Sequence, residues 1–187
     1  MNHFFACYDT ALGACGIAWN AVGRVIGSQL PEATPGETRE RMRSRFPLAR
    51  ESDAPPPQVA EAMEGVRRLL AGQTHDEREL LSIDLEDSQL PDFNRRVLAL
   101  TRRIPVGQTL TYGEIATRLG EPGAARAVGQ AEGHNPFAPI VPCHRVMGAG
   151  GVGTGFSAHG GVQTKLRLLA VEARAAGQFV GEQNPLF

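Results

Sequence analysis

The segment 111–132 constrains the fold more than any other stretch of this 187-residue chain. Thr111 is followed three residues later by Glu114, and this capping-box pattern predicts a helix that begins after Thr111 and runs to about Leu119. Gly120-Glu121-Pro122-Gly123 then predicts a four-residue turn before a second short helix. A helix, a turn of this length and another helix are typical of a helix-turn-helix motif.

The second predicted helix, over residues 124–132, consists mostly of residues with small side chains. Such a helix can approach another surface closely, either inside the protein or on a partner. Arg126 argues against full burial, because an unpaired guanidinium is costly to bury. A regulator of the helix-turn-helix type would need polar side chains that read bases, and this helix is mostly Ala and Gly. The small residues are Ala124, Ala125, Ala127, Gly129 and Ala131.

A proline-rich stretch, residues 135–145, contains a candidate nucleophile. Pro142 fixes its own φ and biases Val141 toward an extended conformation, so Cys143 is presented on a stiff backbone. The thiolate is the nucleophilic form of cysteine, and a neighbouring imidazole such as that of His144 can take the proton. By itself the pair allows two interpretations: a nucleophile with its base, or a structural cysteine beside a surface histidine.

The surroundings of this pair resemble the active-site motif of the O6-alkylguanine-DNA alkyltransferases, a family of suicide DNA-repair proteins. The resemblance extends over roughly residues 90–175, and its segments occur in the order and nearly the spacing of the family. The matching segments are Ala125–Gly129, Asn135-Pro136, Pro142–Val146, Gly160-Gly161, Lys165 and Leu168–Glu172.

The resemblance implies a reaction and a role for each catalytic residue. Cys143 would accept the alkyl group of O6-alkylguanine, and of O4-alkylthymine, in double-stranded DNA, once and irreversibly. His144 would draw off the thiol proton through a water molecule, and Glu172 would hold the imidazole in the needed tautomer. Asn135 would brace the active-site turn. A solvated Glu172 that pairs with Lys165 is the alternative for that residue.

The resemblance also implies how DNA is handled. Tyr112 would donate to guanine N3 and help to flip the nucleotide, while Arg126 would fill the gap in the base stack. The second helix would enter the minor groove through Ala124, Ala125, Ala127 and Gly129. The base pocket would consist of Tyr112, Val146, Phe156 and Ser157, and the family often has tyrosine where Phe156 stands. The family implies no cofactor, and it implies a monomer in the cytoplasm.

Two other classes of protein remain as alternatives. One is a non-catalytic alkylated-DNA-binding or regulatory protein of the same fold, although such relatives replace the cysteine that is present here as Cys143. The other is a Cys-His hydrolase, which would release product repeatedly, whereas an alkyltransferase reacts once per chain.

The N-terminal half predicts an α/β domain. Residues 3–30 contain three short apolar or alternating runs separated by turns, which predict an antiparallel meander. A helix is expected after Pro35, another over Val59–Ala71, and a strand over Leu80–Leu85. We therefore expect residues 1–87 to form an antiparallel sheet with helices, ribonuclease-H-like, without evident catalytic residues.

Residues 88–187 predict a mainly α-helical alkyltransferase domain with the helix-turn-helix and the Pro-Cys-His-Arg site. Its first helix would end near Arg102, and its last helix would follow Gly161. The apolar face expected of that last helix consists of Leu166, Leu169, Ala170 and Ala173.

Charge and cysteine content narrow the choice of partner and cofactor. Residues 1–89 hold 9 Arg/Lys and 14 Asp/Glu, or 9 − 14 = −5, and residues 90–187 hold 10 and 6, or 10 − 6 = +4. Only the second half is therefore suited to an anionic partner.

The four candidate zinc ligands have no metal-site spacing, so no metal is expected. No apolar run approaches the length of a membrane span. The candidate ligands are His3, Cys7, Cys15 and His75.

Overall fold

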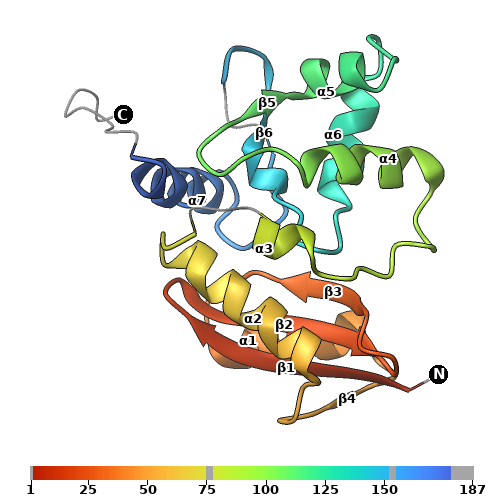
Figure 1. Ribbon diagram of the computed structural model, residues 1–187, viewed down its shortest axis with the longest axis vertical. Coiled ribbons are helices and arrows are strands. Elements are labelled where there is room, and N and C mark those ends of the chain that lie inside the picture. The colour runs from red at the N-terminus through yellow and green to blue at the C-terminus, as the bar shows by residue number, and fades with distance from the viewer. Residues whose placement is uncertain (1, 75–77, 152–154, 178–187) are drawn as a thin grey trace.

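The computed structural model describes residues 2–74, 78–151 and 155–177, which form an α/β N-terminal part and a helical C-terminal part (Figure 1). Four strands form one sheet in the order β3-β2-β1-β4. The strands are β1 (His3–Thr10), β2 (Gly13–Asn20), β3 (Val25–Gln29) and β4 (Ala49–Glu51). The N-terminal helices are α1 (Pro35–Arg45), α2 (Pro57–Leu70) and α3 (Arg78–Leu81).

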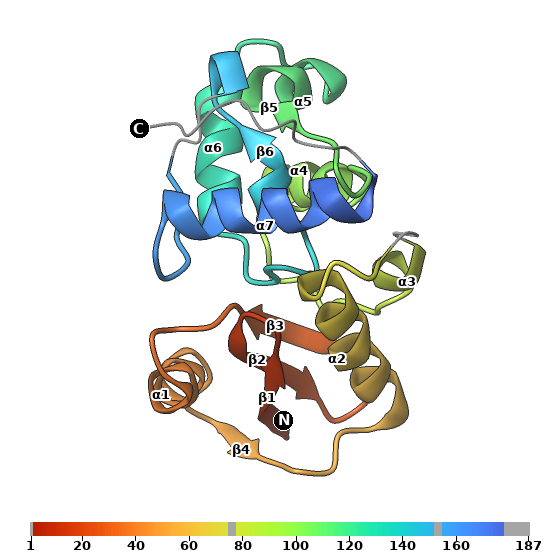
Figure 2. The same cartoon turned by 90° about the vertical axis from the view of Figure 1, so that its left-hand side faces the viewer.

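The expected meander is confirmed, because β1 pairs antiparallel with β2 and β2 with β3. β4 adds to the other edge of β1 in parallel. Alternate residues of β1 face opposite sides of the sheet. Phe5 packs with Met42 of α1 on one side, whereas Tyr8 packs with the apolar residues of α2 on the other. The two helices therefore cover the two faces of the sheet (Figure 2).

α1 begins at the predicted Pro35, whereas α2 begins two residues before the predicted Val59. Thr34 caps α1 with a capping box in which its side chain accepts from the Glu37 backbone N–H, and Pro35 occupies the first turn. α2 begins at Pro57 and ends just before Gly72, whose φ of 70° is a left-handed conformation that glycine adopts without strain.

The strand predicted over Leu80–Leu85 is wrong. α3 continues to Leu81, and only Leu85 makes a β-bridge, to Val25. The physical reason is the guanidinium of Arg102, which donates hydrogen bonds to the carbonyls of Leu80 and Ile83, 2.5 Å and 2.6 Å away. A side chain from a distant helix thus satisfies carbonyls that a strand ladder would otherwise occupy.

The C-terminal part contains the predicted helix-turn-helix. The Thr111 side chain accepts from the Glu114 backbone N–H, and the Glu114 side chain accepts from the Thr111 backbone N–H, which confirms the capping box. Val97, Ile115 and Val128 pack together and bury the contact between these helices. The elements are α4 (Asp92–Thr101), β5 (Leu110–Thr111), α5 (Tyr112–Arg118), α6 (Ala125–Gly133), β6 (Val146–Met147) and α7 (Val162–Ala175).

The apolar face predicted for α7 is wrong. Leu166 is 43% exposed, and Ala170 is exposed as well. The buried side of the helix instead presents Lys165, Leu168 and Glu172. Charged side chains can occupy a buried face only when partners compensate for their desolvation, and both residues have such partners in the site described below.

The edge of the N-terminal sheet holds the loop that precedes Cys143. Ser28 of β3 donates from its backbone N–H to the Pro136 carbonyl at 2.9 Å and from its hydroxyl to the Ala138 carbonyl at 2.9 Å. Arg45 of α1 donates to the same Pro136 carbonyl at 3.0 Å. The largest apolar cluster includes residues from both halves of the chain. Its C-terminal members are Leu98, Phe137, Ile140, Val141 and Leu168.

In the described part of the chain, the longest helices are too short or too polar to cross a membrane.

Candidate active site

The candidate nucleophile stands in a short 3-10 turn, Cys143–Arg145, which connects the proline-rich loop to β6. Asn135 fixes this loop from inside. Its side-chain N–H donates to the Val141 carbonyl at 2.8 Å, and its side-chain oxygen accepts from the Phe137 backbone N–H at 2.9 Å. One asparagine therefore ties the loop on both sides and sets the direction of the backbone that enters Pro142 and Cys143.

The Cys143 side chain lines a cavity of about 400 Å³, a volume within the range of small-molecule sites. The cavity lies between α5, α6, the 3-10 turn and the segment before α7. Of the predicted base-pocket residues, Tyr112, Phe156 and Ser157 line it. Val146 does not belong to the lining formed by the described residues and is fully buried. The described residues that line the cavity are Tyr112, Gly129, Glu132, Gly133, Cys143, Gly155, Phe156 and Ser157.

The thiol is held in its protonated form by its surroundings. Burial raises the pKa of Cys143 to about 12, and the negative charge of Glu132 acts in the same direction. A hydrogen bond from Asn135 and the positive charge of Lys165 oppose this rise. A thiol in this environment needs a base to take its proton before it can act as a nucleophile.

His144, the residue after Cys143, is part of a buried network. His144 Nε2 lies 2.6 Å from Glu172 Oε1, and both side chains are at most 2% exposed. Arg145 donates from Nε to Glu172 Oε2 at 2.9 Å and from Nη2 to Oε1 at 2.8 Å. The third guanidinium nitrogen donates to the Ile104 carbonyl at 2.6 Å. The alternative of a solvated Glu172 is therefore wrong, because the carboxylate is buried between an imidazole and a guanidinium.

The network fixes the protonation state of its members. Burial lowers the pKa of His144, so the imidazole is neutral near pH 7. Burial alone would raise the pKa of Glu172, but His144 and Arg145 outweigh it and lower the pKa to about 2. The Glu172 carboxylate accepts the Nε2 proton, which leaves Nδ1 as the basic nitrogen. Nδ1 is buried and has no hydrogen-bond partner among the described residues.

Lys165 closes the inner side of the site. Its side chain is 1% exposed, and its ammonium donates to the Val146 carbonyl. The same ammonium lies 5.9 Å from the centre of the Tyr112 ring and 6.0 Å from that of Phe156. The cation therefore stands between the two aromatic rings that line the cavity.

Most of the predicted DNA-contacting residues lie on α6 or, as Ala124, directly before it, whereas Tyr112 is the first residue of α5. Arg126 is exposed and makes no ion pair with the described residues, whereas Val128 on the other side of the helix is fully buried. The small residues of this helix are partly accessible around Arg126, namely Ala124, Ala125, Ala127 and Gly129. Gly129 also lines the cavity, so α6 contributes both to the surface and to the pocket.

Glu132 is a pocket residue that the sequence analysis missed. Although its side chain is ionisable, Glu132 is only 5% exposed. It lies on the buried side of α6 with Val128 and Ala131. The spacing in the sequence could have indicated this burial, because Val128 and Glu132 are four residues apart and therefore share one helix face.

No group of three or more metal-binding side chains comes together in the described residues. His75 of the candidate zinc set lies outside them. Cys7 and Cys15 belong to strands whose side chains face opposite sides of the sheet, toward α1 and α2 respectively.

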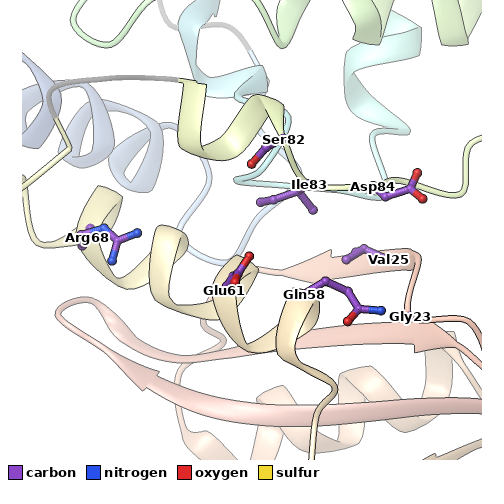
Figure 3. Close-up of a pocket in the computed structure, with 8 residues that line it drawn as sticks. All are labelled: Gly23, Val25, Gln58, Glu61, Arg68, Ser82, Ile83 and Asp84. Atoms are coloured by element: carbon purple, nitrogen blue, oxygen red, sulfur yellow. The ribbon is translucent and has the colours of Figure 1, made fainter.

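A second cavity, of about 280 Å³, lies outside the site. It is formed by one side of α2, the start of β3 and residues 82–84 (Figure 3). The described residues of its lining include none of the predicted site residues.

The fold and the site define a class of protein in which a buried cysteine, followed by a histidine that is paired with a buried glutamate, lies beside a helix-turn-helix. A model described as the DNA-binding domain of 6-O-methylguanine DNA methyltransferase matches residues 92–174. The crystal structure of Mycobacterium tuberculosis OGT in complex with DNA superimposes with a TM-score of 0.73 at 32% identity, over 92% of this chain and 94% of that one. The chain belongs to the family of methylated-DNA–protein-cysteine methyltransferases.

Two further relatives show the extent of the similarity. The methylated-DNA–protein-cysteine methyltransferase of Mycolicibacterium paratuberculosis is 54% identical over 97 residues, which are 51% of this chain and 58% of the relative. The aligned part thus covers less than two thirds of this curated relative. The O6-methylguanine-DNA methyltransferase of Pyrococcus kodakaraensis has a TM-score of 0.68 at 26% identity, over 90% of this chain and 99% of that one.

Proposed function

We propose that this protein repairs DNA by transferring the alkyl group of O6-alkylguanine, and of O4-alkylthymine, to Cys143 in a single irreversible step. The observation that carries the proposal is the position of Cys143, in a cavity of ligand size and next to a neutral histidine that a buried carboxylate orients. The names of the relatives support the same reaction. We expect the protein to act as a monomer in the cytoplasm and without a cofactor.

The chemistry requires a proton to leave before the sulfur attacks. A water between Cys143 and His144 Nδ1 would carry the thiol proton to the imidazole, and Glu172 would stabilise the imidazolium. The thiolate then forms a bond to the alkyl carbon while the bond from that carbon to guanine O6 breaks. The electron pair goes to the guanine, which takes up a proton. The thioether is a poor leaving group, so the protein does not turn over.

DNA would be bound along α6. Half of the molecule has a formal charge of +4, and the surface of α6 has small residues around one exposed Arg126. Small side chains allow the helix to enter the narrow minor groove, and the guanidinium would replace the base that rotates into the pocket. Tyr112 would contact the flipped base and its phosphate, and its position at the start of α5 and in the cavity lining supports this role.

We further propose that the chain consists of two structural domains, residues 1–87 and 88–187, which do not act independently. The contacts of Ser28 and Arg45 with the loop before Cys143 support this, because they make the N-terminal sheet a support of the active-site loop.

The test is a reaction with duplex DNA that contains one O6-methylguanine. We expect one methyl group per chain, on Cys143, as seen by intact mass and peptide mapping. Cys143→Ser should take up none, although Cys7 and Cys15 are retained. A methyl group on Cys7 or Cys15, or release of more than one guanine per chain, would contradict the proposal. Binding without transfer would favour the non-catalytic alternative, and repeated product release would favour a hydrolase.

A further inference from the structure

The cavity with Cys143 contains a carboxyl group that the proposed reaction does not use. Glu132 is 5% exposed and lines the cavity together with Cys143. One carboxyl oxygen accepts a hydrogen bond from the hydroxyl of Thr101 on α4. The other, Oε2, is buried and has no hydrogen-bond partner among the described residues. A buried carboxylate oxygen without a partner is costly, and this cost favours the protonated form of Glu132.

Few charged or titratable groups surround Glu132, and α4 contributes only the uncharged Thr101 hydroxyl. Lys165 of α7 is the cation that acts on it, and the Cys143 thiol and the Tyr112 hydroxyl are the other titratable groups at the cavity. Burial raises the pKa of Glu132 to about 7, and the Thr101 hydrogen bond and the Lys165 charge only partly oppose this. The carboxyl therefore changes its charge in the range where such a protein would work.

We propose that Glu132 makes the cavity select alkyl groups by charge, so that an anionic O6-substituent such as carboxymethyl is transferred less readily than methyl. The inference rests on the proposed function and names a specificity residue for it. An alkyl group must lie beside Cys143 to react, and an anionic group there lies in the same cavity as the Glu132 carboxylate. When Glu132 is neutral, the charge of Lys165 is left unopposed and attracts the anion instead.

The size of the effect follows from the charges. Two like charges roughly 10 Å apart at an effective dielectric constant of about 20 repel strongly enough to change a rate roughly tenfold. We therefore expect Glu132→Gln to raise the ratio of carboxymethyl to methyl transfer about tenfold near pH 8. Glutamine keeps the shape of the side chain and an oxygen that can accept from Thr101.

The ratio of the two rates is the informative measurement. Binding of DNA is common to both substrates. Cys143, whose pKa is raised to about 12, and His144, whose pKa is lowered by burial, both stay uncharged over this pH range, so neither changes the charge in the cavity. In the unaltered protein the ratio should fall as the pH rises from about 6 to about 8.5, because Glu132 becomes charged while a carboxymethyl group, with a pKa near 4, stays charged throughout. In Glu132→Gln the ratio should not change with pH.

Two controls separate charge from size and from general effects. O6-hydroxyethylguanine has a neutral group of similar size, and its rate relative to methyl should not depend on pH. Glu61→Gln removes the same charge from an exposed residue of the second cavity and should leave the ratio unchanged (Figure 3).

The outcomes distinguish this inference from the proposed function. Absence of methyl transfer by the unaltered protein would refute the proposed function. Methyl transfer with a ratio that is independent of pH, or that rises with pH, would overturn the role of Glu132 and leave the reaction standing. The pH series of the unaltered protein gives this answer even if Glu132→Gln does not fold.

Discussion

Two buried glutamates of the site have pKa values that are shifted in opposite directions by their neighbours. Glu172 accepts hydrogen bonds from Arg145 and pairs with His144, and its pKa is lowered to about 2. Glu132 has only a hydroxyl donor and a more distant cation, and its pKa is raised to about 7. Equal burial thus gives a permanent carboxylate in one place and a titrating carboxyl in the other.

Glu172→Gln should destabilise the protein in a way that depends on pH. A carboxyl with a lowered folded-state pKa adds stability above its unfolded pKa of about 4.3, and this is lost as the pH falls toward 2. Leaving Arg145 without its anion should cost about 3–5 kcal/mol at pH 7. Urea unfolding of both proteins at pH 7 and at about pH 3 measures the difference, which should be smaller at the lower pH.

The control for this prediction is Glu61→Gln, which removes an exposed carboxylate and should change the free energy of unfolding by less than about 0.5 kcal/mol. An equal loss at both pH values would show that Glu172 contributes through its shape and packing, and not through its charge.

At the scale of elements, α6 combines two functions on one short helix. Its buried side presents Val128, Ala131 and Glu132 to the core and the cavity, while Arg126 points to solvent among small residues. The capping box of Thr111 and Glu114 fixes the start of α5, and α5 packs on α6. The position of Arg126 relative to the cavity is therefore set by rigid helices.

Arg126→Ala should separate DNA handling from chemistry. Reaction with a free O6-alkylguanine base, which needs no flipping, should proceed at nearly the normal rate. Reaction with the same lesion in duplex DNA should slow at least tenfold, because unstacking costs a few kcal/mol that the guanidinium no longer offsets. Single-turnover rates on the two substrates measure this difference.

Arg118→Ala is the matched control, because it removes an exposed arginine from α5 instead. Loss of a cationic contact alone gives a defect that shrinks as salt rises, whereas a defect in base flipping persists. Equal slowing of the free base and the duplex by Arg126→Ala would assign Arg126 a structural role.

Side chains of each part of the molecule donate hydrogen bonds to backbone carbonyls of the other part, including those of the loop before Cys143. Ser28 and Arg45 of the N-terminal part bind the carbonyls of Pro136 and Ala138, and Arg102 of the C-terminal part binds those of Leu80 and Ile83. The largest apolar cluster contains residues of both parts. These reciprocal contacts mean that neither part keeps its buried polar groups satisfied without the other.

We therefore expect both parts to unfold together. Cys15 is fully buried in the N-terminal part, and Cys143 lines the cavity of the C-terminal part. Each thiol reports on its own half when its labelling is measured relative to its rate in the native protein. Brief labelling with a thiol reagent across a urea series, followed by peptide mapping, should give the same midpoint for both cysteines.

Cys7, which is only partly buried, serves as the reference for labelling in the folded state. Midpoints that differ for Cys15 and Cys143, together with Trp19 fluorescence that follows Cys15 alone, would show that the two parts fold as independent domains.

Local signals in the sequence determined the meander, the capped helices and the helix-turn-helix. The capping box of Thr111 and Glu114, the prolines before Cys143 and the strand alternation each depend on residues close in sequence, so they can be read without the fold. The resemblance around Cys143 also placed His144, Asn135 and Glu172 in one site, and the contacts of these residues agree with that placement.

Only the tertiary structure decided which charged residues are buried. Lys165 and Glu172 replaced the predicted apolar face of α7, and Arg102 prevented a strand at Leu80–Leu85. In each case the partner lies far away in the sequence, as with Glu172 and His144, which are 28 residues apart. A periodic pattern assumes that charge faces water. That assumption fails wherever a distant partner offsets the cost of desolvation. Because of the same assumption, Glu132 was not predicted to line the pocket.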